Sequence, residues 1–108
     1  MPSPLGFDGG LTVSFQVRDM KRSAKWYEDV LGFKLEYEVG DIGWCEVRTE
    51  CLRVFFGFSQ VENPQVGAGV VPVMGVADIA AARGLLEQKG VEFDGDTRTI
   101  PGLSLIHI

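Results

Sequence analysis

The chain has 108 residues, 45% hydrophobic and 23% charged, which is enough for one globular domain with a modest core. Its net charge of −5 and the lack of any Lys or Arg run argue against nucleic acid and anionic membranes as partners, since both attract clustered positive charge. No leader peptide or bilayer-length apolar run is evident and two cysteines are too few for a disulfide framework, so we expect a cytoplasmic protein with free thiols.

A strand and a helix are the first predicted elements. Apolar Val13, Phe15 and Val17 alternate with polar Thr12, Ser14 and Gln16, which is typical of a strand with one buried face. Asp19 follows where its carboxylate can cap the first turn of a helix. The apolar stripe of that helix is Met20, Ala24, Tyr27 and Leu31, and Gly32 marks its end.

Three more strands are predicted after this helix. The segment 33–39 alternates Phe33, Leu35, Tyr37 and Val39 against charged residues, and strands at 43–48 and 51–58 follow, separated by turns. Residues 11–58 therefore form a βαβββ module. The polar, glycine-containing stretch 59–69 is interpreted as a linker.

The chain then repeats itself. Residues 17–39 return as 76–93, with Val17 matching Val76, Asp19 matching Asp78, and a glycine closing each helix. The second copy predicts a strand at 70–76, a helix at 79–89 and a short strand at 91–94. Two strands of a full module are mostly missing.

The run from Val17 to Phe33 resembles the opening of a vicinal oxygen chelate module, the superfamily of glyoxalases, bleomycin-resistance proteins and dioxygenases. The pattern V-x-D-x-x-x-(S/A)-x-x-(W/F)-Y-x-x-x-L-G-F is met at Val17, Asp19, Ser23, Trp26, Tyr27, Leu31, Gly32 and Phe33. The resemblance implies an α+β fold in which two βαβββ modules, the second one truncated at about residues 70–102, form a curved sheet around a cavity. Many such proteins dimerise, so we expect a homodimer.

Enzymes of this superfamily hold a divalent metal with His and Glu side chains on cavity-lining strands. The resemblance places the first ligand seven residues before each capping Asp, which gives Thr12 and Val71 here. The region of the next ligand contains Phe and Gly, followed by Gln60. Because a metal site needs three or more protein ligands, we expect no metal and no cofactor.

The chain ends in LSLIHI, residues 103–108, which carries the only histidine, His107. Relatives of this type are expected to continue after Gly102 with a turn similar to D-P-D-G-N and a final strand. The six residues are instead those encoded by CTG-TCT-CTT-ATA-CAC-ATC, a transposon end used in sequencing libraries. We interpret 103–108 as a non-native tail and expect no role for His107; a genuine short terminal strand is the alternative.

The candidate ligand-binding residues lie on strand faces turned away from the first helix, namely Thr12, Ser14, Gln16, Trp44 and Glu46. Trp44 offers a stacking surface beside the carboxylate of Glu46, which suits an aromatic or cationic molecule. The alternative is an ordinary, half-exposed strand face on which Glu46 pairs with Arg48 and Trp44 lies at a dimer contact. Trp26 and Tyr27 are predicted to serve packing, whereas Phe55, Phe56 and Phe58 fit a cavity wall and a core equally well.

Metal-free binding of a small molecule is the function we expect. Two alternatives remain: a metal-dependent lyase or dioxygenase with non-standard ligands, and a non-catalytic dimerisation module. No pair of nucleophile and base is evident, because the only histidine is His107.

Overall fold

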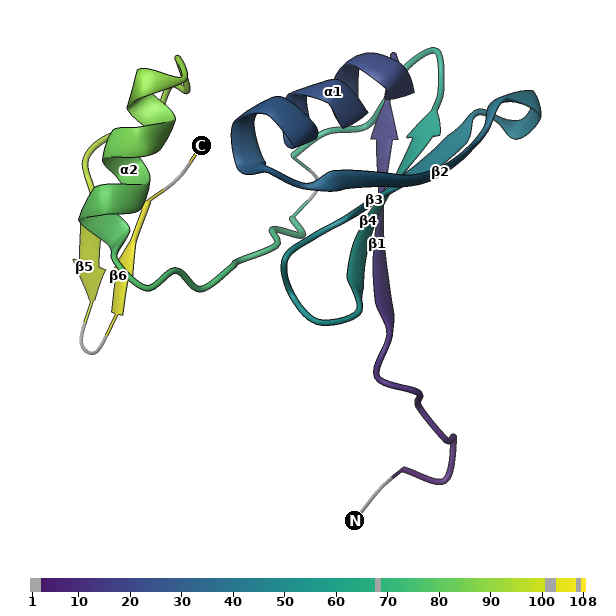
Figure 1. The fold of residues 1–108 in the computed structure, drawn as a ribbon, viewed down its shortest axis with the longest axis horizontal. Coiled ribbons are helices and arrows are strands. Elements are labelled where there is room, and N and C mark those ends of the chain that lie inside the picture. Colours follow the sequence, from purple (N-terminus) through teal and green to yellow (C-terminus); the bar gives the residue numbers. More distant parts are fainter. Residues whose placement is uncertain (1–2, 68, 101–102, 107) are drawn as a thin grey trace. The chain divides into compact units, whose positions relative to one another are not determined.

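A computed structural model describes residues 3–67, 69–100, 103–106 and 108 (Figure 1). The described chain divides into two compact units, Met1–Gly69 and Val70–Ile108. In the described residues, no helix is both long enough and apolar enough to cross a membrane.

The first unit is a curved four-stranded sheet with one helix on it (Figure 1). Its elements are β1 (Leu11–Val17), α1 (Met20–Leu31), β2 (Lys34–Val39), the short 3-10 helix η1 (Gly40–Ile42), β3 (Trp44–Arg48) and β4 (Val54–Gln60). The strand order is β1-β4-β3-β2, with β1 parallel to β4 and the other pairs antiparallel. The predicted α+β class and the βαβββ order of this module are confirmed, and the sheet is open rather than a closed barrel.

Helix α1 begins and ends at the predicted residues. The Asp19 carboxylate accepts a hydrogen bond from the Arg22 N–H at 3.1 Å, which satisfies one of the free donors of the first turn. Gly32 ends the helix with a φ of 76°, the left-handed conformation that favours glycine. Local chemistry therefore fixes both ends of this helix.

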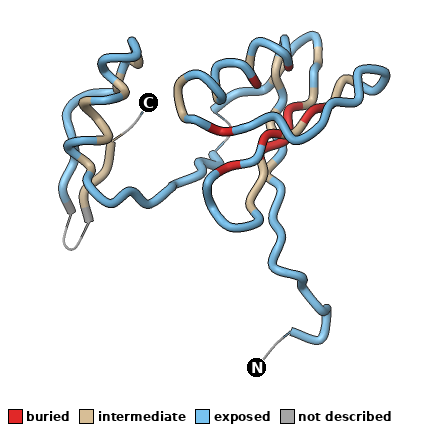
Figure 2. The backbone as a smooth tube through the Cα atoms, in the orientation of Figure 1, coloured by how far each residue is buried: buried red, intermediate tan, exposed pale blue. Residues whose placement is uncertain are grey.

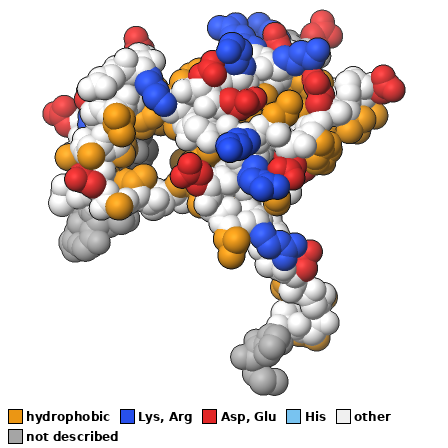
Figure 3. Space-filling view, in the orientation of Figure 1, with side chains coloured by type: hydrophobic (Ala, Val, Ile, Leu, Met, Phe, Trp, Pro, Cys, Tyr) orange, Lys and Arg blue, Asp and Glu red, His pale blue; other side chains and the backbone are white. Residues whose placement is uncertain are grey.

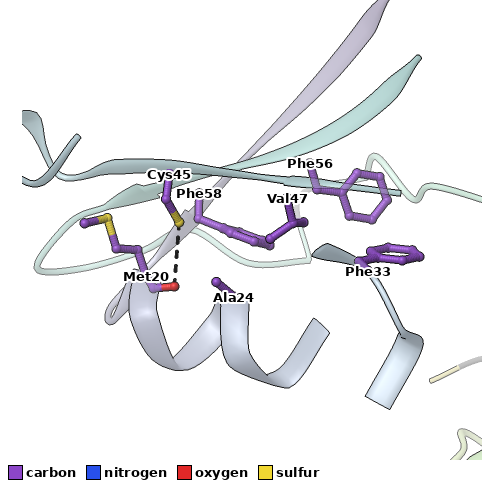
Figure 4. Packing of buried hydrophobic residues seen from close by; sticks show 7 residues of the cluster. All are labelled: Met20, Ala24, Phe33, Cys45, Val47, Phe56 and Phe58. Atoms are coloured by element: carbon purple, nitrogen blue, oxygen red, sulfur yellow. Dashed lines mark hydrogen bonds between the residues drawn. The ribbon is translucent and has the colours of Figure 1, made fainter. Parts of the chain in front are cut away.

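The core lies between α1 and the sheet (Figures 2 and 4). Its buried hydrophobic residues come from the helix, from Phe33 and from the two central strands: Met20, Ala24, Phe33, Cys45, Val47, Phe56 and Phe58. Val13, Phe15 and Val17 pack against this cluster, as the alternation of β1 predicts. Tyr27 packs there too, whereas Trp26 is 37% exposed. Phe56 and Phe58 are thus core residues.

Strand β4 begins three residues later than predicted, because a turn occupies the preceding residues. The buried Thr49 hydroxyl donates to the Val54 carbonyl at 2.6 Å and accepts from the Cys51 N–H at 3.1 Å. These bonds hold the backbone in a turn, so the strand starts at Val54.

The second unit contains α2 (Ile79–Gln88) and an antiparallel pair, β5 (Arg98–Ile100) and β6 (Leu103–Leu105). Asp78 caps α2 through the Ala81 N–H at 3.1 Å, and Gly90 follows the helix with a φ of 83°. No described residue of α2 is buried, as the tube in Figure 2 shows. The helix and its cap are as predicted.

Two predicted strands of this unit are wrong. Residues 70–76 form no strand, and Val70, Val71 and Val73 are 79%, 69% and 73% exposed. Pro72 lacks an N–H for a strand ladder, and neither sheet of the described residues includes this segment. Residues 91–94 form no strand because they fold back onto α2. The Val91 N–H donates to the Leu86 carbonyl at 3.1 Å, and the Arg83 guanidinium carbon lies 4.5 Å from the centre of the Phe93 ring.

Candidate functional site

Helix α1 covers one face of the four-stranded sheet; we call the other the open face. Residues paired across adjacent strands point to the same face, so the register assigns each side chain. Ser14 pairs with Gly57, Gly57 with Glu46, and Glu46 with Tyr37, which makes one row across all four strands. This row runs across the open face.

The structure places all five predicted ligand-binding residues on the open face. Gln16 and Trp44 share the row of Ser59, on one side of the Ser14–Glu46 row, and Thr12 shares the row of Phe55 on the other side. Thr12, Ser14 and Gln16 are exposed, and Trp44 and Glu46 are half-buried. The sheet thus brings the predicted residues together; their binding of a ligand stays a prediction.

The indole of Trp44 lies against the backbone of β4 at Gly57. A Cβ atom at position 57 would lie 2.1 Å from Cη2 and 2.3 Å from Cζ2 of this ring, so only glycine leaves room for it. The Nε1–H of Trp44 donates to the Tyr37 hydroxyl at 3.1 Å. Trp44 is therefore held at both its ring and its nitrogen.

Tyr37 also points to the open face, which the sequence did not predict. The alternation of residues 33–39 grouped Tyr37 with Phe33 and Leu35, but the register shifts between Leu35 and Tyr37. One extra residue in a strand reverses the alternation beyond it, so Tyr37 points to the open face. Its hydroxyl hydrogen-bonds the Glu46 carboxylate, and this bond raises the pKa of Tyr37 above its usual value.

Arg48 forms its ion pair with Glu36. Its Nε and Nη2 donate to the two carboxylate oxygens of Glu36 at 2.9 and 2.8 Å, a bidentate ion pair. The pairing of Arg48 with Glu46, which belonged to the alternative interpretation of this face, is wrong, because the register shift in β2 leaves Glu36 within reach of the guanidinium.

Gln16 has a structural contact of its own. Its side-chain oxygen accepts the Gln65 N–H at 2.9 Å, which holds the segment after β4 against β1. Of the β1 residues predicted for binding, Thr12 and Ser14 present exposed hydroxyls.

Two shallow hollows of the structure lie away from the predicted residues. One, of about 440 Å³, lies between α1 and the strands β2 and β3, with Lys21, Lys25 and Glu38 in its wall. The other, of about 740 Å³, lies at the start of α1 beside Arg18 and Arg22. Charged side chains of both signs mix over α1 in Figure 3. The open face is a curved, accessible surface and lines neither hollow.

The donors at the expected metal positions do not fit a divalent ion. Thr12 lies on the open face, Val71 is on the unpaired segment, and Gln60 shares its face with Val17, on the helix side. The Gln60 side-chain oxygen is already occupied, since it accepts the Met20 N–H at 3.0 Å. Within residues 3–67, 69–100, 103–106 and 108, no three His, Cys, Asp or Glu side chains gather into a possible metal site. His107 lies outside the described residues.

Comparison with known proteins identifies relatives of this fold. The profile of the Glyoxalase/Bleomycin resistance protein/Dioxygenase superfamily matches residues 11–107. No curated protein sequence matches the chain.

Several solved structures are similar in fold at low sequence identity. TnmS3, an antibiotic binding protein from Streptomyces sp. CB03234, is 18% identical with a TM-score of 0.71, over 87% of this chain and 80% of that one. A superfamily member from Sphaerobacter thermophilus DSM 20745 is 17% identical with a TM-score of 0.71, over 88% and 82%. The bleomycin resistance determinant encoded on transposon Tn5 is 17% identical with a TM-score of 0.58, over 75% and 64%.

Proposed function

The chain belongs to the Glyoxalase/Bleomycin resistance protein/Dioxygenase superfamily, and on that premise we propose that it binds a small planar molecule, aromatic or cationic, on its open face without a metal. One observation carries this proposal: the Trp44 indole is fixed against Gly57 next to the carboxylate of Glu46. An aromatic surface beside a negative charge attracts a flat cation by stacking and by charge.

Further observations support this ligand class. The net charge of −5 favours the approach of a cation. The Arg48 guanidinium is matched by Glu36, so it does not neutralise Glu46. TnmS3, which shares the fold, is an antibiotic binding protein. We place the activity in the cytoplasm, where reducing conditions keep Cys45 and Cys51 as free thiols.

A titration with a planar cation tests the proposal. We expect 9-aminoacridine, a flat cation at neutral pH, to raise the melting temperature saturably, because a ligand at about 100 times its Kd stabilises the native state by about 2.7 kcal/mol. Trp44→Ala should weaken binding about 5- to 30-fold, the loss of about 1–2 kcal/mol of stacking and cation–π attraction. Glu46→Gln should weaken it by removing the charge alone.

Trp26→Phe is the matched control. Trp26 lies on α1, on the covered side of the sheet, so this change should leave the Kd unchanged. The proposal fails if 9-aminoacridine does not bind, or if Trp44→Ala and Trp26→Phe bind it as tightly as the wild-type chain does.

A second role, formation of a homodimer, is favoured by residues 70–76. Val70, Val71, Val73 and Val76 are all more than half exposed in one continuous segment, and β1 is an edge strand of its sheet. Exposed apolar segments and open edges favour association with another chain. Light scattering should give the mass of a dimer for the wild-type chain and of a monomer for Val71→Lys with Val73→Lys. A monomeric wild-type chain would contradict this role.

A further inference from the structure

Three side chains of the open face form one chain of hydrogen bonds. The Trp44 Nε1–H donates to the Tyr37 oxygen at 3.1 Å, and hydrogen bonding with the Glu46 carboxylate raises the pKa of the Tyr37 hydroxyl. Glu46 and Tyr37 are direct cross-strand neighbours, so the backbone register brings these groups together. An indole has one donor and a carboxylate has only acceptors, so the hydrogen bonds run in one direction, from Trp44 through Tyr37 to Glu46.

The direction of the chain decides what the site offers to a ligand. Both donors, the indole N–H and the phenol O–H, already donate to another member of this hydrogen-bonded group. The carboxylate at its end has about four lone-pair positions, of which Tyr37 occupies one. The cluster of Trp44, Tyr37 and Glu46 therefore accepts hydrogen bonds from a ligand and has no donor left for one.

We propose that Tyr37 is the specificity-determining residue of the open face: its hydroxyl fixes Trp44 and Glu46 as one acceptor-only unit, which selects planar ligands with N–H donors or a positive charge and rejects planar anions. This inference rests on the proposed function. It adds a residue and a reason for selection, since stacking on Trp44 alone does not discriminate between a flat cation and a flat anion.

The other charged groups of this face contribute little to the choice between cationic and anionic ligands, so Glu46 determines it. Arg48 and Lys34 lie in the neighbouring row, opposite each other on β3 and β2. Arg48 is bound at both carboxylate oxygens of Glu36, and the Lys34 side chain is exposed to solvent. An exposed charge is screened by water and salt, so it attracts an anion only weakly.

Removal of one oxygen atom tests this role. Tyr37→Phe keeps the ring, frees the Trp44 N–H as a donor, and takes from Glu46 the group that orients it. Tyr37 is 44% exposed, so the change leaves the core intact. Affinity for a planar cation should fall, and affinity for a planar anion should rise, because the indole N–H becomes available to it. A residue that merely supported the fold would shift both affinities in the same direction.

The experiment measures the Kd of 9-aminoacridine, a cation, and of acridine-9-carboxylate, an anion, for the wild-type chain, Tyr37→Phe and Tyr27→Phe. The wild-type preference for the cation should fall about tenfold in Tyr37→Phe, since one hydrogen bond to a charged group is lost. Tyr27→Phe removes the chain's other phenol, which packs against the core on the helix side of the sheet, and should keep the preference. In parallel, the ¹⁵N–¹H resonance of the Trp44 indole should shift in Tyr37→Phe while that of Trp26 stays in place.

An unchanged preference in Tyr37→Phe, with both dyes binding, would overturn this inference and leave the proposed function standing. Absence of binding of either dye to the wild-type chain would overturn the proposed function and the selection with it. If the Trp44 indole resonance has the same chemical shift in Tyr37→Phe as in the wild-type chain, Tyr37 does not position Trp44, regardless of the dye affinities.

Discussion

Substitution of Gly57 by alanine should disable the open face without unfolding the chain. The new Cβ would lie 2.1 Å from Cη2 of Trp44, whereas carbon atoms in contact sit about 3.5–4.0 Å apart. The ring must therefore move by about 1.5 Å. The Trp44–Tyr37 hydrogen bond is 3.1 Å long, near the upper end of the normal range, so this movement breaks it.

The cost to stability should be small. Gly57 is not among the glycines with positive φ, so alanine fits its backbone and gains about 0.4–1 kcal/mol by restricting the unfolded chain. Overpacking costs about 1–3 kcal/mol, and a half-buried ring that can turn outwards keeps the cost at the low end. The net loss in free energy of unfolding is thus about 0–2 kcal/mol.

Two assays separate these effects: urea unfolding for stability, and titration with 9-aminoacridine for the site. Gly57→Ala should bind the dye at least about 5-fold more weakly, as Trp44→Ala does. Gly40→Ala is the matched control, because nothing lies within 4 Å of a Cβ at that position and its φ is not positive. Wild-type affinity in Gly57→Ala, with unchanged Trp44 fluorescence, would refute the placement of the indole on Gly57.

Four other predictions concern the first unit. Phe58→Ala should lower the free energy of unfolding in urea by about 3–5 kcal/mol, because Phe58 is 1% exposed in the core; a loss below about 1 kcal/mol would contradict the core assignment. Asp19→Ala should cost about 1 kcal/mol in the same assay through the lost cap, whereas Asp19→Asn should cost little; equal costs would argue against capping. Burial raises the pKa of the Cys45 thiol, so its contribution to stability is complete below the ordinary thiol pKa and is lost as the pH rises through the raised one. The urea midpoint should accordingly fall more at alkaline pH for the wild-type chain than for Cys45→Ala, and native protein should react with a thiol reagent at exposed Cys51 before buried Cys45.

The helices were predictable because their signals are local. Asp19 and Asp78 each bond an N–H three residues ahead, and both helices are followed by a glycine with positive φ. These signals require only the chain itself. The alternation of β1 likewise predicted which of its residues face α1, since a strand with one buried face has a period of two.

The errors concern features that depend on a partner strand. Residues 70–76 occupy the place of a strand in the internal repeat, but a strand exists only when another segment pairs with it. The register shift in β2 moved Tyr37 to the open face, and nothing in the alternation of 33–39 marks it. The sequence marked Gly57 only as a residue that cannot bind a metal, whereas in the structure it leaves room for the indole of Trp44.

The most direct test of the central claim is to map the 9-aminoacridine contacts by the amide chemical-shift changes it causes in the ¹⁵N-labelled wild-type chain. The account predicts that the largest changes fall on the row of Ser14, Gly57, Glu46 and Tyr37 and on Trp44. Changes centred on α1 and its hollows, with the open face unaffected, would contradict it.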